Sequence, residues 1–132
     1  PESSGEAIHT STFLGHPLAC VAALAVLETL EGECVAERAR VLGSQLLELL
    51  RSELESVPAV VDVRGLGVLI GIELAGDAQA VRVAEAALRE GLILLPAGDR
   101  GHVIELTPPA TLNDVQLKYA CDVLCRLIRE VV

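Results

Sequence analysis

Apolar residues recur along this chain with two different periods, and the change of period separates predicted helices from predicted strands. Residues 17–31 and 34–55 carry apolar side chains at helical spacing, and Gly32 and Pro58 interrupt the two patterns. Residues 60–74 are instead rich in β-branched side chains and punctuated by glycine. This pattern predicts a short strand, a glycine bend and a longer buried strand.

The second half of the chain alternates between the same two patterns. Residues 78–90 predict a third helix, which Gly91 ends in a left-handed conformation. Two apolar segments follow, at residues 92–96 and 102–106, and a glycine-rich turn between them predicts an antiparallel pair of strands. A last helix is expected over about residues 112–131.

The start of that last helix carries a sequence signature of its own. Thr111 followed three residues later by Asp114 resembles a capping box, in which side chains bind the free N–H groups of a first helical turn. The predicted order is therefore helix, helix, strand, helix, strand, strand, helix. It indicates an α/β (α+β) sandwich with a mainly antiparallel sheet of three to four strands, covered by helices.

Composition and charge narrow the function classes. The 132 residues are 52% apolar with almost no aromatic side chains, and the net charge of −9 argues against binding to nucleic-acid phosphates. No apolar run reaches the length of a membrane span, and no signal peptide is recognisable, so a cytoplasmic protein without membrane contact is expected.

The cysteines and histidines show no spacing typical of a metal site, so no metal is expected. Cys121 and Cys125 lie four residues apart and therefore on one face of the last predicted helix. A disulfide or a metal pair is one interpretation of these two residues. Buried small hydrophobic side chains are the favoured one.

A loop rich in hydroxyl groups precedes the first predicted helix. Residues 9–20 read His-Thr-Ser-Thr-Phe-Leu-Gly-His-Pro-Leu-Ala-Cys, and the helix should start at Pro17, where a missing N–H costs nothing. A buried core has no use for three consecutive hydroxyl residues. They serve either to cap the loop's own backbone or to contact a ligand, and a Ser–Thr pair offers donors to a phosphate.

This segment resembles the loop of class III pyridoxal-phosphate aminotransferases (ornithine, acetylornithine and 4-aminobutyrate type), which reads close to His-Gly-Ser-Thr-Phe-Gly-Gly-Asn-Pro-Leu-Ala. Four further segments echo the family in order and at its spacing, namely residues 62–67, 71–74, 91–94 and 106–109. The resemblance covers nearly the whole chain. It implies the small C-terminal domain of a fold-type I enzyme, preceded at residues 1–16 by an arm from the large-domain side that holds the cofactor phosphate, with the small domain at 17–132.

The resemblance also implies roles for two hydroxyl residues. The family's threonine reaches across a homodimer interface to the phosphate of pyridoxal 5'-phosphate, which assigns Thr12 and, beside it, Ser11 to cofactor binding. Without the resemblance, the residues favour the plainer interpretation that both hydroxyls satisfy the loop's backbone. His16 stands where the family has asparagine and is a poorer helix cap.

Two charged residues are candidates for contact with the substrate. Glu105 occupies a strand position where relatives that act on ornithine or 4-aminobutyrate tend to carry an arginine that binds a carboxylate. A glutamate repels that group, so either the carboxylate is recognised elsewhere or the substrate presents an amine or a neutral group. A solvated strand glutamate is the alternative. Arg64 is the second candidate, and both Arg64 and Arg100 are candidates for anion contacts. His102 is expected to be an exposed strand residue.

No residue of this chain is expected to be catalytic, because the only lysine, Lys118, falls on the exposed side of the last helix. Pyridoxal-phosphate chemistry needs a Schiff-base lysine, which the family carries upstream of the phosphate threonine. We therefore expect the C-terminal portion of an aminotransferase that moves an amino group from an amine or amino acid to a 2-oxo acid or aldehyde. A racemase or epimerase of the same fold, and a free-standing non-catalytic α/β ligand-binding or dimerisation module, are the alternatives.

Overall fold

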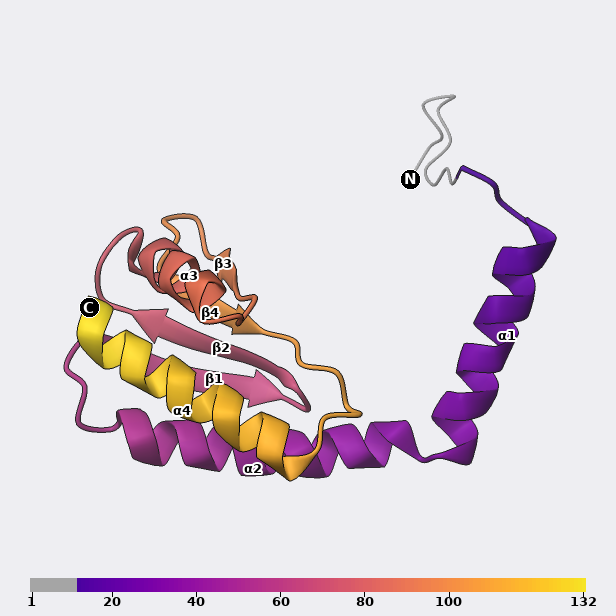
Figure 1. Cartoon of the computed structure of the whole chain (residues 1–132), viewed down its shortest axis with the longest axis horizontal. Helices are drawn as coiled ribbons and strands as arrows, with labels where there is room; N and C mark the ends of the chain where they lie inside the picture. Colours follow the sequence, from indigo (N-terminus) through magenta and orange to yellow (C-terminus); the bar gives the residue numbers. More distant parts are fainter. Residues whose placement is uncertain (1–11) are drawn as a thin grey trace, which may run out of the picture. The chain divides into compact units, whose positions relative to one another are not determined.

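The computed structural model describes residues 12–132, which form four helices and four strands (Figure 1). In chain order the elements are α1 (Pro17–Gly32), α2 (Val35–Leu54), β1 (Val60–Leu66), β2 (Leu69–Leu74), α3 (Gln79–Arg89), β3 (Leu95–Ala97), β4 (Val103–Leu106) and α4 (Asp114–Val131). The chain divides into two compact units, residues 1–35 and 36–132. The predicted division into an arm at residues 1–16 and a small domain at residues 17–132 stays a prediction.

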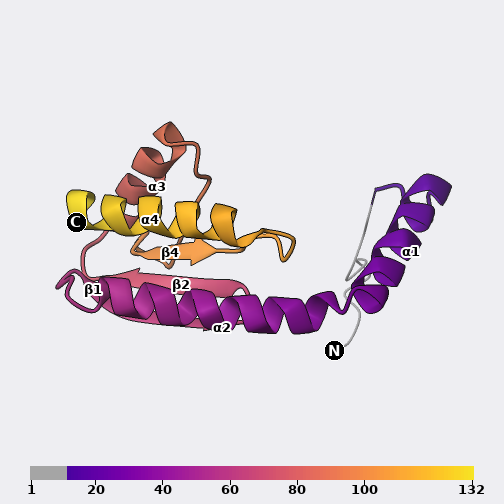
Figure 2. The ribbon, with the colours of Figure 1, turned by 60° about the horizontal axis from the view of Figure 1, so that its bottom comes forward.

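The sheet belongs to the second unit and has the strand order β1-β2-β4-β3, with every neighbouring pair antiparallel. One face is apolar because the side chains of Val63, Ile70, Ile72, Ile104 and Leu106 point to it and are buried. Helices α2, α3 and α4 all contribute to the same buried cluster, so they cover this face together (Figure 2). The predicted fold class is confirmed.

Each covering helix is amphipathic, and its buried stripe follows the predicted period. In α2 the buried side chains include Leu46, Leu50 and Leu54, whereas Leu49 is 37% exposed. Of these two neighbouring leucines, Leu50 therefore occupies the core position. Full burial of a leucine contributes on the order of 2 kcal/mol, so these residues supply much of the packing energy.

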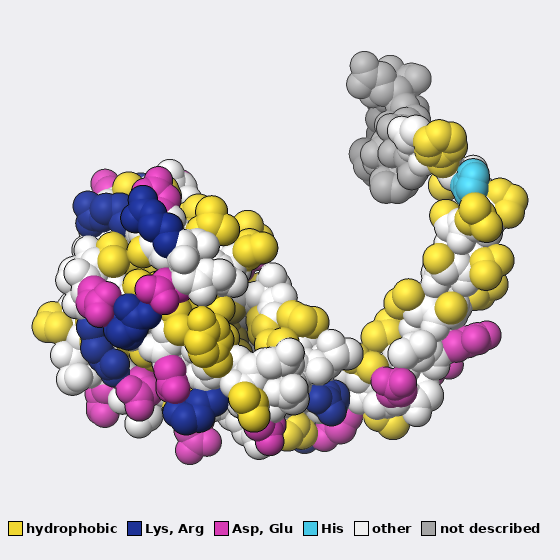
Figure 3. All heavy atoms as spheres, viewed as in Figure 1, with side chains coloured by type: hydrophobic (Ala, Val, Ile, Leu, Met, Phe, Trp, Pro, Cys, Tyr) yellow, Lys and Arg dark blue, Asp and Glu magenta, His cyan; other side chains and the backbone are white. Residues whose placement is uncertain are grey.

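Helix α1 differs from the other three because it has no buried face among the described residues. It begins at Pro17, as predicted, and ends at Gly32, one residue after the predicted end. Leu18, Val21 and Leu24 are each more than half exposed. Figure 3 shows hydrophobic side chains exposed along the length of this helix.

Two glycines bring α2 against the turn between β1 and β2. A Cβ atom on Gly43 of α2 would overlap the carbonyl group of Gly67 and lie 2.9 Å from its Cα. Gly67 has a φ of +56°, in the left-handed region that glycine adopts without strain. Further along the helix, Arg51 Nε donates a hydrogen bond of 2.9 Å to the backbone oxygen of Val63 in β1. Helix α2 and the β1–β2 hairpin thus contact each other at two points, Gly43 with Gly67 and Arg51 with Val63.

The strand predicted at residues 92–96 begins later than expected, because β3 covers only Leu95–Ala97. The backbone N–H of Leu92 donates a 2.8 Å hydrogen bond to Ala87 in the last turn of α3. That bond closes the helix and commits Leu92 to its end rather than to a strand. The apolar run was correctly identified as buried in part, since Leu92 and Leu94 pack against the core.

The cap of α4 lies two residues after the predicted one. Asn113 Oδ1 accepts a hydrogen bond of 2.9 Å from the backbone of Gln116, and the Gln116 side chain accepts one of 3.1 Å from the backbone of Asn113. This reciprocal pair is a capping box, and the helix begins at Asp114. The prediction that Thr111 starts the helix is therefore wrong.

The contact between Gly43 and Gly67 predicts a large loss of stability from one methyl group. Gly43→Ala should lower the free energy of unfolding by at least about 2 kcal/mol, because the added Cβ meets backbone that cannot rotate away. Gly32→Ala is the matched control, since a Cβ there meets nothing within 4 Å. Urea unfolding followed by circular dichroism measures both variants. Equal stabilities would contradict the close approach.

The capping box predicts unequal effects for two neighbouring positions. Asn113→Ala should lower the free energy of unfolding by about 1 kcal/mol, because the backbone N–H of Gln116 in the first turn loses its partner. Thr111→Ala should change it by less than about 0.5 kcal/mol, as at an ordinary surface position. Thermal unfolding of both variants at one pH measures the difference, and a larger loss from Thr111→Ala would restore the original assignment.

Candidate functional site

A short turn leads into α1 and carries the residues expected to bind the cofactor. Phe13 and Gly15 have φ angles of +59° and +76°, and the backbone N–H of His16 closes the turn with a 3.0 Å hydrogen bond to the oxygen of Phe13. The His16 ring lies edge-on to the Phe13 ring, with centroids 5.9 Å apart. His16 occupies the N-cap position of the helix but makes no side-chain cap.

This turn offers hydrogen-bond donors of the kind that an anion requires. The side chain of Thr12 is exposed, and His16, the N-cap residue of the helix that follows, makes no side-chain cap. The first N–H groups of a helix and its dipole both favour a negative charge at this end. The donor set therefore fits a phosphate group. Ser11, the second predicted phosphate ligand, lies outside the described residues.

A second candidate region lies on the face of the sheet that the helices leave uncovered. The strand register aligns Arg64 with Gly71, Gly71 with Glu105 and Glu105 with Leu95 in one row across all four strands. Because Gly71 has no side chain, the row is hollow between Arg64 and Glu105. A cavity of about 480 Å³ lies there, and Leu66, Leu69 and Val103 add apolar walls.

Arg64 is already engaged by two carboxylates on this face. Its Nη1 atom lies 2.9 Å from Asp62 Oδ2 and 2.7 Å from Glu73 Oε2. The hydrogen bonds that it donates to Asp62 and then to Glu73 raise the pKa of the Arg64 guanidinium. The arginine predicted as an anion contact is thus a structural hydrogen-bonding residue as well, and Nη1 is committed.

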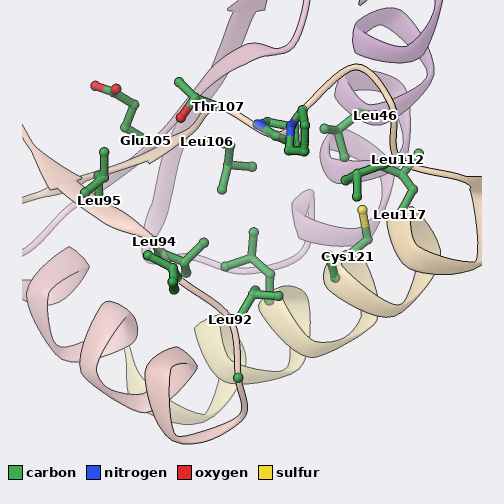
Figure 4. A pocket seen from close by; sticks show the side chains of 16 residues that line it. Leu46, Leu92, Leu94, Leu95, Glu105, Leu106, Thr107, Leu112, Leu117 and Cys121 are labelled. Carbon is green, nitrogen blue, oxygen red and sulfur yellow. The ribbon is translucent and has the colours of Figure 1, made fainter.

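Glu105 differs from Arg64 because its carboxylate has no hydrogen bond or ion pair with any residue in the described part of the chain. The side chain is half-buried, and its register position puts it on the same face as Arg64. In Figure 4 the carboxylate of Glu105 points away from the side chains of Leu94 and Leu106. The sequence identified Glu105 but gave no sign of the glycine hollow beside it.

An apolar cavity of about 350 Å³ lies between the residues that follow α3, the end of β4 and α4, and Glu105 is among the residues that line it (Figure 4). Leu92, Leu94 and Leu106 line it together with the thiol of Cys121. Burial raises the pKa of Cys121 to about 11, so the thiol stays neutral and behaves as an apolar wall. Cys125 is also buried and free, which confirms both residues as small hydrophobic side chains.

The structure also places three further residues that were considered from the sequence, namely His102, Arg100 and Lys118. The expectation that His102 is exposed is wrong: it is buried, and its Nδ1 atom accepts no hydrogen bond and lies 4.0 Å from Asp99 Oδ1. The tight turn before β4 folds the ring against Gly98, where a Cβ would lie 2.7 Å from it. Arg100 forms an ion pair of 2.7 Å with Asp77.

Lys118 is exposed, as predicted, and its ammonium group lies 2.9 Å from the carboxylate of Asp122 on the next turn of α4. Within residues 12–132, no three potential metal ligands gather into a site. None of the helices there is long and apolar enough to cross a membrane.

Comparison with known proteins agrees along most of the chain. The family model described as aminotransferase class-III matches residues 2–128. The acetylornithine aminotransferase of Synechocystis sp. is 35% identical over 127 residues, which are 94% of this chain and 29% of that enzyme. The 4-aminobutyrate aminotransferase of Escherichia coli is 37% identical over 127 residues, or 90% of this chain and 30% of that enzyme.

Solved structures agree with the sequences. The ornithine aminotransferase of Toxoplasma gondii, described with partial occupancy of PLP at its active site, superposes with a TM-score of 0.81 at 34% identity. The match covers 93% of this chain and 29% of that one. The chain thus spans about three tenths of the length of the relatives that it matches. Its sequence and its fold agree with the same group of enzymes, and the chain belongs to the class III aminotransferase family.

Proposed function

We propose that this chain forms the C-terminal portion of a pyridoxal-phosphate-dependent aminotransferase, which transfers an amino group from an amine or amino acid to a 2-oxo acid or aldehyde. The observation that carries the proposal is the family match over residues 2–128. The relatives named above are aminotransferases for acetylornithine, 4-aminobutyrate and ornithine. As the chain spans about three tenths of their length, the reaction is assigned to the whole enzyme.

Within that enzyme, residues 1–16 form the arm that holds the cofactor phosphate and residues 17–132 form the small domain. The Thr12 hydroxyl donates a hydrogen bond to a phosphate oxygen of the cofactor held by the partner subunit of a homodimer, and Ser11 assists it. The exposed side chain of Thr12 and its place just before the N-terminal end of α1 support this role. Pyridoxal phosphate, when bound, supplies the electron sink for chemistry at the carbon that bears the amino group.

The small domain contributes walls to the substrate pocket through residues 61–71 and 92–106. These segments include Arg64, Gly71 and Glu105 on the uncovered face of the sheet. Here the chain's own residues bind and orient the substrate rather than move protons. The enzyme is expected to work in the cytoplasm.

The chain itself does not provide the amine that pyridoxal-phosphate enzymes require. Lys118 is the only lysine in the sequence, and its ammonium group is bound to Asp122 on the exposed side of α4. The catalytic lysine and the carboxylate that holds the cofactor ring therefore come from the preceding part of the enzyme. By this assignment residues 1–132 position groups and do not catalyse.

The proposal is tested by expressing the chain together with the sequence that precedes residue 1 in its gene. The purified protein should be yellow, and borohydride should reduce the chromophore irreversibly. It should also produce an amino acid from a 2-oxo acid with an amine donor present. A colourless protein with neither property would refute the function, and exchange of the substrate α-proton without amino transfer would indicate a racemase or epimerase instead.

Thr12 provides a quantitative test of the phosphate contact in that enzyme. Thr12→Ala should weaken the affinity for pyridoxal phosphate roughly 10- to 100-fold, because a hydrogen bond to a charged group contributes about 1.5–3 kcal/mol. Equilibrium dialysis followed by the absorbance of the bound cofactor measures the dissociation constant. Ser11→Ala should give a smaller loss.

Thr29→Ala is the matched control, since Thr29 is also exposed and its hydroxyl donates to the backbone of Ala25 within α1. Its affinity for the cofactor should equal that of the wild type. The phosphate role of Thr12 would be refuted if the Thr12 and Thr29 variants retained the cofactor equally well.

A further inference from the structure

The uncovered face of the sheet holds a carboxylate that nothing in the described chain neutralises. Glu105 is half-buried at the edge of the 480 Å³ hollow over Gly71 and makes no ion pair or hydrogen bond there. The other acids on this face, Asp62 and Glu73, are both bound to Arg64. Glu105 is therefore the one charged group in this hollow that still has its full capacity to accept hydrogen bonds.

The charges around the hollow determine which ligand fits it. Three carboxylates and one guanidinium share this face, namely those of Asp62, Glu73, Glu105 and Arg64. An anionic ligand group here would meet an excess of negative charge, and Arg64 Nη1 is already shared between two acids. A cationic group placed against Glu105 would instead gain a partner without displacing any existing ion pair.

The walls of the hollow restrict the ligand further. Leu66 and Leu69 are 88% and 53% exposed, and with Val103 they offer apolar surface next to the carboxylate. One carboxylate alone is a poor site for a metal ion, and the described residues contain no group of three potential metal ligands. An ammonium group on a short aliphatic chain satisfies both the charge and the apolar walls.

We propose that Glu105 binds a protonated amino group at the end of the substrate that does not react, so that the enzyme accepts aliphatic diamines or amino acids with a side-chain ammonium group. Gly71 contributes to this specificity together with Glu105, because the absence of a side chain at Gly71 leaves the space that the alkyl chain of the ligand occupies. The identification of the ligand as a substrate rests on the proposed aminotransferase function. The ammonium site itself does not.

The test measures ligand binding to the 132-residue chain without cofactor. Titration with 1,5-diaminopentane should give saturable changes in the ¹H–¹⁵N spectrum centred on Gly71, Val103 and Glu105. The neutral analogue 1,5-pentanediol should bind at least tenfold more weakly. Because no reaction is measured, a colourless full-length enzyme would refute the proposed function and leave this result standing.

Two pairs of variants decide the role of the carboxylate. Glu105→Gln should weaken diamine binding at least tenfold, whereas Glu48→Gln, which removes the same charge from an exposed position on α2, should not change it. This control matters because the net charge of −9 attracts any diamine. Gly71→Val should also weaken binding, and the strand has room for its Cβ, which would make an ordinary 3.5 Å contact with Val103.

Three results would overturn the proposal. The first is equal affinity of the Glu105→Gln chain and the wild type, with well-dispersed spectra for both. The second is a set of spectral changes confined to residues away from the sheet. The third is stronger binding of pentanedioate than of the diamine, lost in Arg64→Gln, which would identify the hollow as an anion site.

Discussion

The backbone contact between Gly43 in α2 and Gly67 in the β1–β2 turn is the constraint from which the arrangement of the sheet follows. No side chain separates the two elements at this point, so the hairpin approaches the helix more closely than any pair of larger residues permits. The Arg51–Val63 hydrogen bond then holds β1 to the same helix. With β1 and β2 fixed, the antiparallel register extends across β4 to β3.

Along single strands of this sheet, residues that pack in the core alternate with residues that face outwards. In β4, Ile104 and Leu106 face the helices and are buried, while Glu105 between them faces outwards. In β2, Gly71 alternates in the same way with Ile70 and Ile72. The buried set of side chains stabilises the fold, and the outward set includes the residues of the proposed ammonium site. A change at Glu105 or Gly71 therefore leaves the buried side chains of the core in place.

Prediction from sequence succeeded where a local pattern determines the structure. Helical periodicity gave the bounds of α1 and α2 to within a residue or two, and Cys121 and Cys125 were correctly placed in the core. It was wrong where a residue makes a contact that the local pattern of apolar residues does not indicate. The N–H of Leu92 closes α3 instead of joining a strand, and the ring of His102 folds into a turn. The row from Arg64 to Glu105 depends on cross-strand register, which spacing along one strand does not reveal.

Helix α1 follows the turn that carries Thr12 and has no buried side chain among the described residues. Apolar side chains lie on every side of this helix, and none of them is buried within the described residues. Leu18 and Leu24, for example, are largely exposed. A helix of this composition is stable when other elements cover it on all sides. The turn that carries Thr12 leads directly into the N-terminal end of that helix. On the proposed phosphate role of Thr12, the packing of α1 and the retention of the cofactor are therefore coupled. The comparison of Thr12→Ala with Thr29→Ala separates these two effects, because both threonines flank or belong to α1 and only Thr12 lies at the end where the phosphate is proposed to bind.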